Sequence, residues 1–463
     1  MAIAATSGAW RSELRAMLWL AAPLAAANLL QMLVYSIDVI FVARLGEQAL
    51  SASSLAVSLF GIMMWCFSGL TSACAPIIAA ELGRRRHAVR EVRRSVRMAL
   101  WLALVCSLLG MAICLFGEGF MLLTGQEPVV SRRAGAFLAI LLWAMPAAII
   151  ANVLRTFVAA LGRPVFATLI TLLSIVVNSV GNYAFVFGHF GAPQMGLDGS
   201  AVSSVLTSWI GVAAYAAAIA TDRRLRRYRI FGNWWRPEWQ RLRDLVRIGV
   251  PIALIILAEG GLFTSAAFLM GLIGEAQLAA HTIALQLGAL AFQIPFGIGQ
   301  AATIRVGYHF GAGNRHGIGT AGQAALLISM VYMAIPALLM LFAPSLLLSL
   351  YIDPYAPERA VLVGYAIVFL RIAAAFQLFD GAQAVLAGLL RGLQDTRIPM
   401  IMALTGYWIF GFGTSVALGF FTPLAGAGVW VGLATGLVVV SFLLATRWRG
   451  RGRLGLESAS FAG

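Results

Sequence analysis

The sequence predicts an all-α integral membrane protein with twelve transmembrane helices in two six-helix repeats of the same orientation. Hydrophobic residues make up 61% of the 463 residues and charged residues only 11%, whereas a soluble domain carries about 25% charged residues. Apolar stretches of roughly 20 residues, each long enough to cross a bilayer, recur from end to end. The first half also matches the second half when the sequence is shifted by 228 positions.

The internal match runs without a gap for about sixty residues, and repeats on this scale indicate a duplicated bundle. Duplicated membrane bundles with a site between their halves are typical of secondary transporters. The matching pairs are Arg15 and Arg243, Pro23 and Pro251, Gly46 and Gly274, Glu47 and Glu275, Leu50 and Leu278, Gly69 and Gly297, Ala73 and Ala301, and Gly83 and Gly311.

Each half holds six apolar spans, so each half begins and ends on the same side of the membrane. We therefore expect an N-lobe at residues 1–235, with a cytoplasmic linker to about 247, and a C-lobe at residues 236–463 that ends in a basic tail. The expected spans are 17–43, 53–80, 98–124, 134–155, 165–187, 200–220, 248–272, 279–305, 321–350, 361–390, 398–420 and 425–446.

The charge of the chain predicts its topology. The net charge is +15, and all 33 basic residues are arginines. On the twelve-span assignment 28 of them fall on one side and 4 on the other, while Arg371 lies within a span. Basic residues collect on the cytoplasmic side, so both termini are expected in the cytoplasm and the charge does not indicate nucleic-acid binding. The Trp- and Arg-rich linker at 221–247 is expected to form an interfacial helix.

Missing motifs exclude other classes of protein. The chain contains no lysine, so it has no phosphate-binding loop of the Walker type. No GxSxG, HExxH or Cys/His catalytic set is present either. We therefore expect no enzyme activity and no cofactor, and we expect an ion gradient to supply the energy.

Asp38 is a carboxylate inside the first span, where ionised groups are costly and tend to be functional. Gln31, Tyr35 and Asp38 are spaced i, i+4, i+7, which places them on one helical face. The fifth span carries a second polar stripe that includes Asn178 and Asn182. A carboxylate facing two amide oxygens is a candidate Na⁺ site or proton-exchange site. The alternative is hydrogen bonding that only holds the helices together.

The second half carries its own intramembrane acids, Glu259 in the seventh span and Asp380 in the tenth, with Gln377 three residues before Asp380. Under the 228-residue shift Glu259 matches Gln31, and Asp38 matches Ala266, so the halves share a fold but not their ionisable residues. The eighth span also carries a polar line that suits a wet cavity or helix packing. Its members are Thr282, Gln286, Gln293 and Gln300.

Several motifs resemble the multidrug and toxic compound extrusion (MATE) transporters, in particular their bacterial NorM-like branch, over nearly the whole chain. They are Tyr35-Ser-Ile-Asp38, Ala43-Arg-Leu-Gly46, Ala301-Ala-Thr-Ile-Arg305-Val-Gly307, Gly311-Ala-Gly-Asn314, Arg391-Gly-Leu-Gln-Asp-Thr-Arg397-Ile-Pro399 and Trp235-Arg-Pro-Glu-Trp239.

The resemblance implies an antiporter that exports organic, often cationic compounds while Na⁺ or H⁺ enters. Asp38, Asn178 and Asn182 match the family's N-lobe cation site, with Ser204 as its hydroxyl ligand. Glu259 and Asp380 match the C-lobe acids, which form a second candidate Na⁺ site. The sequence departs from the pattern at Phe376, where some members carry Tyr, so the C-lobe site lacks one phenol oxygen.

The expected partners are therefore organic cations or drugs and the lipid bilayer of a bacterial inner membrane, with the protein acting as a monomer. The alternative function is a flippase for lipid-linked oligosaccharides or lipids. A flippase would favour basic residues in its lumen, whereas this chain places acids there.

Overall fold

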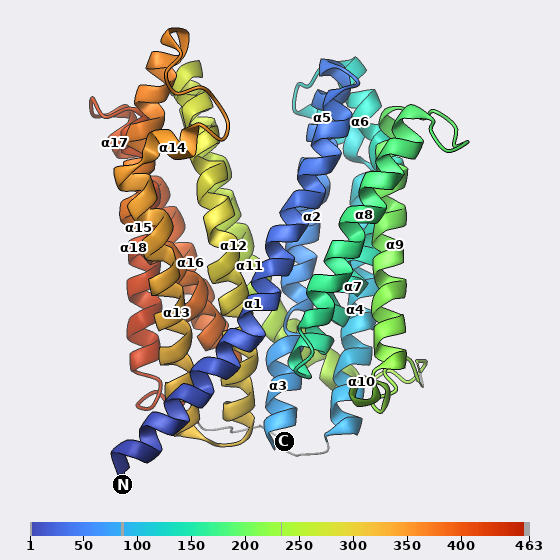
Figure 1. Cartoon of the computed structure of the whole chain (residues 1–463), viewed down its shortest axis with the longest axis vertical. Coiled ribbons are helices and arrows are strands. Elements are labelled where there is room, and N and C mark those ends of the chain that lie inside the picture. Colours follow the sequence, from blue (N-terminus) through green and yellow to red (C-terminus); the bar gives the residue numbers. More distant parts are fainter. Residues whose placement is uncertain (1, 85–87, 233, 458–463) are drawn as a thin grey trace. The chain divides into compact units, whose positions relative to one another are not determined.

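The computed structural model describes residues 2–84, 88–232 and 234–457, which fold almost entirely into helices (Figure 1). Within these residues, eleven helices are long and apolar enough to cross a membrane. They become twelve when the pair Pro128–Leu141 and Ala144–Ala160, bent by 48° at a short break, counts as one span. The predicted fold class, an all-α bundle of twelve spans, is confirmed.

The first repeat provides six spans, three of which are broken into two helices. These helices are α1 (Ala2–Ala43), α2 (Glu47–Thr71) with α3 (Cys74–Arg84), α4 (Val89–Leu115) with α5 (Gly117–Leu123), α6 (Pro128–Leu141) with α7 (Ala144–Ala160), α8 (Val165–Phe187) and α9 (Leu197–Thr221).

A short helix, α10 (Arg223–Arg226), precedes the second repeat. The later spans are α11 (Trp239–Ile273), α12 (Glu275–Gly311), α13 (Arg315–Phe342) with α14 (Pro344–Leu348), the turn η1 (Pro357–Arg359) with α15 (Ala360–Gly392), then α16 (Arg397–Leu404), η2 (Thr405–Phe412) and α17 (Gly413–Phe420) in a single span, and α18 (Gly426–Arg449). The segment η2 is a π-helix.

The chain divides into two compact units, but the division does not fall at the predicted lobe boundary between residues 235 and 236. The N-unit is Ala26–Ala253, and the C-unit is Met1–Ala25 together with Leu254–Gly463. The helices α1 and α11 therefore each contribute to both units. Pro23 and Pro251 lie inside these helices, and the chain passes from one unit to the other two residues after each proline.

Ion pairs near the starts of α1 and α11 explain this division. In the C-unit, the Arg305 guanidinium of α12 donates to both Glu13 carboxylate oxygens over 2.8 and 2.5 Å, and the His309 ring lies 3.2 Å from the same carboxylate. In the N-unit, Arg241 of α11 contacts Glu81 at 3.1 Å and Glu91 at 2.8 Å. Because such partly buried ion pairs hold helices together, the N-terminal parts of α1 and α11 pack with helices of the opposite repeat.

The linker differs from the interfacial helix predicted for it. Apart from α10, the described residues between α9 and α11 form turns. They dock on α4: the Trp101 indole donates to the Trp234 carbonyl over 3.0 Å, and Arg97 donates to Glu238 over 2.6 Å. These bonds anchor the irregular part of the linker to α4, whereas the last nine residues of the predicted segment, 239–247, are helical and belong to α11.

Candidate functional site

Three helices of the N-unit bring polar side chains to the carboxylate of Asp38. Asn178 and Asn182 of α8 each donate an amide N–H to Oδ1, over 2.9 and 2.7 Å, and the Ser204 hydroxyl of α9 donates to Oδ2 over 3.1 Å. Both asparagines are fully buried. The four residues that the sequence singled out for this site therefore meet at one point, which we call the Asp38 centre.

The centre forms where α8 and α9 approach each other closely. A Cβ added to Gly181 would lie 2.4 Å from the Ser203 hydroxyl, and one added to Gly199 would lie 2.3 Å from the Phe185 carbonyl oxygen. Small residues at such contacts let two helix backbones come together. Ser203 then donates to the Asn178 carbonyl over 3.1 Å, which fixes the helix that carries both asparagines.

The amide orientation differs from the sequence expectation. We expected amide oxygens to face Asp38, but both asparagines present their nitrogens to it. An anionic carboxylate accepts hydrogen bonds, so donors turn toward it. In this arrangement a proton can bind to Asp38 without any rearrangement of the amides. Na⁺, which needs oxygen ligands, requires the amide groups to rotate.

The other two predicted residues on α1 lie beside this centre. Gln31 is half-buried, and Tyr35 is 53% exposed. Tyr35 lies about one helical turn before Asp38, so the i, i+4, i+7 stripe is present on the helix. Only its last member is enclosed by α8 and α9 side chains.

The C-unit contains a second set of acids, which we call the Glu259–Asp380 centre. Glu259 lies on α11, Asp380 lies on α15 and is 6% exposed, and their charges interact. Gln383, one turn after Asp380, donates to Glu259 over 3.4 Å. A close contact between α15 and α12 positions Asp380, since a Cβ on Gly388 would lie 2.3 Å from the Gly299 carbonyl oxygen.

Several buried polar atoms around this centre have no hydrogen-bond partner among the described residues. They are Asp380 Oδ1, both amide atoms of Gln377, Gln383 Oε1 and the Tyr407 hydroxyl. Each such atom costs about 1–3 kcal/mol when it is left without a partner. This centre therefore has several buried polar atoms without a partner among the described residues, whereas at the Asp38 centre the carboxylate accepts three hydrogen bonds and the Asn182 amide oxygen lacks a partner.

The predicted polar line on α12 does not form one polar wall. Gln286 is exposed, and Gln293 is half-buried and donates to the Ala289 carbonyl of its own helix over 3.2 Å. Gln300 is the member whose side-chain oxygen is buried without a partner among the described residues. Gln377 of α15, in contrast, is fully buried in the same unit as Asp380.

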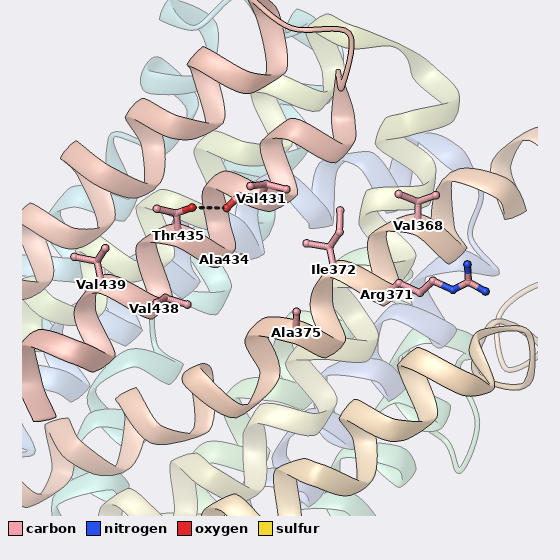
Figure 2. Close-up of a pocket in the computed structure, with 9 residues that line it drawn as sticks. All are labelled: Val368, Arg371, Ile372, Ala375, Val431, Ala434, Thr435, Val438 and Val439. Carbon is pink, nitrogen blue, oxygen red and sulfur yellow. Dashed lines mark hydrogen bonds between the residues drawn. The ribbon is translucent and has the colours of Figure 1, made fainter.

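Arg371 lies on the side of α15 away from Asp380, as its spacing predicts. It lines a groove of about 600 Å³ between α15 and α18, and Figure 2 shows its side chain extending away from α18. It makes no ion pair with any residue that the structure describes. The other lining residues are Val368, Ile372, Ala375, Val431, Ala434, Thr435, Val438 and Val439.

Sequence reasoning missed three polar residues in these centres: Ser203, Gln383 and Tyr407. Gln383 follows Asp380 by three residues and Gln377 by six, so the helical spacing of α15 contained a usable signal. Ser203 stands directly before Ser204, on a neighbouring face of α9. Tyr407 gave no signal, because its orientation depends on the π-helical turn described above.

Comparisons with known proteins agree with this architecture. A family model described as MatE matches residues 23–184 and 251–416, one match in each half. The chain is 44% identical to the probable multidrug resistance protein NorM of Mesorhizobium japonicum, over 96% of this chain and 95% of that protein. It is 39% identical to the protein of the same name in Brucella suis, over 95% and 93%.

Solved structures share the fold at low sequence identity. The eukaryotic MATE transporter AtDTX14 superposes with a TM-score of 0.82 at 22% identity, covering 97% of this chain and 99% of that one. A MOP superfamily transporter from Pyrococcus furiosus superposes with a TM-score of 0.85, also at 22% identity, covering 96% and 97%. With family matches in both halves and close relatives along its whole length, the chain belongs to the MatE family of membrane transporters.

Proposed function

We propose that this protein exports lipophilic organic cations in exchange for Na⁺ or H⁺ that enters the cell. The observation that carries the proposal is the Asp38 centre, in which a carboxylate enclosed in a membrane bundle accepts hydrogen bonds from Asn178, Asn182 and Ser204. An enclosed anion attracts any cation that can reach it, because the bilayer does not solvate charge. The multidrug resistance names of the relatives from Mesorhizobium and Brucella support drugs as the substrates.

Competition for the acids provides a mechanism of coupling. A bound drug cation and a coupling cation cannot both neutralise the same carboxylate, so binding of one weakens binding of the other. To drive transport, the coupling ion must bind the two conformations of the protein with affinities that differ by a few kcal/mol. The prolines inside α1 and α11 lack an N–H, and they lie where these helices pass between the units, so they are the expected flex points.

The two centres suit different coupling ions. Asp38 is surrounded by donors and can take a proton without further change, whereas the Glu259–Asp380 centre offers unpaired oxygens, which hard cations such as Na⁺ prefer. The proposal therefore places H⁺ at Asp38 and Na⁺ at Glu259 and Asp380, with no other cofactor. Both centres are present in one chain, so a monomer is sufficient for transport.

The setting follows from charge. The arginine distribution supports a cytoplasmic position for both termini, and the relatives from Mesorhizobium and Brucella are bacterial, so the bacterial inner membrane is the proposed location.

Dye efflux from vesicles tests the proposal, with a Na⁺ gradient and a pH gradient imposed separately. Wild type should export a fluorescent organic cation under at least one gradient, and Asp38→Asn and Asp380→Asn should each lose at least tenfold in rate. Asp353→Asn is the control, because Asp353 is an exposed loop acid whose carboxylate accepts the Tyr355 backbone N–H at 3.0 Å. Equal dye retention in wild type, both variants and empty vesicles would exclude efflux and leave the flippase to be tested with lipid-linked substrates.

A further inference from the structure

The span that contains η2 has an unusual backbone. Between α16 and α17, residues Thr405–Phe412 form a π-helix, a rare conformation that appears frequently at functional sites. Such a turn changes the direction in which its side chains point. Tyr407 lies within it and is fully buried, so the π-helix directs a phenol into the interior of the C-unit.

Packing on both sides holds η2, the segment that carries Tyr407, against the helices beside the two acids. Toward α11, Trp408 rests on Gly261, where an added Cβ would lie 2.8 Å from the indole ring; Gly261 follows Glu259 by two residues. Toward α18, Gly406 packs against Val440. The next residue, Ser441, donates to the Phe379 carbonyl over 2.6 Å, and Phe379 directly precedes Asp380.

Electrostatics agree with this placement. Both Glu259 and Asp380 lie close enough to the Tyr407 phenol to interact with it electrostatically. Two acids from different helices and one phenol from a third segment therefore share one buried region of the C-unit.

The Tyr407 hydroxyl has no hydrogen-bond partner among the described residues, and the same is true of Asp380 Oδ1. A buried hydroxyl without a partner is destabilising. If Tyr407 served only to fill space, Phe would fill it without that cost. A phenol can donate its O–H to a carboxylate and offer a lone pair to a cation at the same time, and these are the two interactions that a carboxylate cation site uses.

The side chain one helical turn before Asp380 provides no oxygen atom to the centre. Phe376, one turn before Asp380, stacks on Trp430 with ring centroids 5.7 Å apart and an angle of 17°. The phenol oxygen that α15 lacks is present instead on η2, the segment that belongs to the eleventh span.

We propose that Tyr407 is a cation ligand of the Glu259–Asp380 centre, its phenol replacing the oxygen that Phe376 does not provide. The O–H donates to one of the two carboxylates, and a lone pair completes the oxygen shell of the bound cation. This inference rests on the proposed function, because it names a further ligand of the same site.

The test is Tyr407→Phe, which removes one oxygen and keeps the ring. The control is Tyr365→Phe, on α15 in the same unit, where the ring stacks on Phe369 with centroids 6.3 Å apart. Purified proteins are titrated with NaCl against choline chloride at fixed pH, and separately with acid at fixed ionic strength, while the thermal midpoint is followed. This readout reports cation binding and does not require transport.

We expect Tyr407→Phe to need about tenfold more cation for half of the stabilising shift, while Tyr365→Phe follows wild type. Without cation, Tyr407→Phe should melt at or above the wild-type midpoint, because a buried unpaired hydroxyl is gone; this serves as the check on folding. If Tyr407→Phe and wild type reach half of the stabilising shift at the same cation concentration, the inference is overturned even if efflux is normal. It is also overturned if no cation stabilises the wild-type protein. Reduced cation binding in Tyr407→Phe would uphold it even if dye efflux failed.

Discussion

The Asp38 centre and the Glu259–Asp380 centre show two ways of burying a carboxylate in a membrane bundle. At the first, every hydrogen bond to the acid comes from a fixed neighbour, and the anion is stabilised by three donors. At the second, two acids share one region, a single bond of 3.4 Å connects Gln383 to Glu259, and several polar atoms have no partner among the described residues. The carboxylate of the first centre is well supplied with hydrogen-bond donors, whereas the second centre leaves more of its polar atoms without a partner among the described residues.

The largest expected contrast lies in the stability of the two neutralised variants. Asp38→Asn removes a charge from three donors and should lower the free energy of unfolding by about 3 kcal/mol, since charged hydrogen bonds contribute about 1.5–3 kcal/mol each. Asp380→Asn removes a charge that is poorly compensated, and it should raise that free energy by about 1 kcal/mol. Thermal midpoints in one detergent, without Na⁺, measure both. Shifts of the same sign would show that the two centres do not differ in this way.

Cation-dependent stabilisation sharpens the comparison. Na⁺ at 100 times its dissociation constant should stabilise wild type by about 2.7 kcal/mol. Na⁺ should no longer stabilise Asp380→Asn but should still stabilise Asp38→Asn, because the proposed Na⁺ site is the Glu259–Asp380 centre of the C-unit. Midpoints in NaCl and in choline chloride give the comparison, and the opposite pattern would move the Na⁺ site to Asp38.

The neighbouring amides should also differ in what they contribute. Asn182→Leu removes a 2.7 Å bond to Asp38 and should cost about 2 kcal/mol. Gln383→Met removes only a 3.4 Å bond and an unpaired oxygen, so its cost should stay below about 0.5 kcal/mol. Denaturant midpoints of the two variants check this order. A larger loss in Gln383→Met would mean that Gln383 holds Glu259 firmly in place.

The smallest effect is expected at Arg371. Arg371→Gln changes an exposed side chain in the groove between α15 and α18, so stability should change by less than about 0.5 kcal/mol, and dye efflux should stay at the wild-type rate. Comparing this variant with Asp380→Asn distinguishes the effect of losing an acid inside the C-unit from the effect of losing a charge on its surface. A tenfold drop in efflux would link Arg371 to the transport path.

Much of this architecture could be predicted from the sequence because membrane spans obey simple rules. Length, apolar composition and the 228-residue repeat predict the fold, and the spacing of Gln31, Tyr35 and Asp38 predicts one face of α1. Asn178 and Asn182, four residues apart on α8, were predictable in the same way. Wherever a helix is regular, residue spacing alone is sufficient to predict which side chains share a face.

The remaining features depend on contacts that spacing does not encode. Tyr407 is turned inward by a π-helix, which breaks the 3.6-residue periodicity on which such predictions depend. The amide orientation at Asp38 depends on which partner accepts and which donates, and the sequence cannot give this. The division into units depends on where Glu13 and Arg241 find their ion-pair partners, far along the chain.

Those ion pairs have a consequence for how the two halves can assemble. Glu13 and Arg241 are equivalent positions of the repeat, and so are Glu81 and His309, yet Glu13 faces His309 while Arg241 faces Glu81. Two copies of the first half would bring Glu13 against Glu81, and two copies of the second would bring Arg241 against His309 and Arg305. Like charges in such contacts disfavour the wrong partner. At these contacts, each half therefore carries charges that favour pairing with the other half over pairing with a second copy of itself.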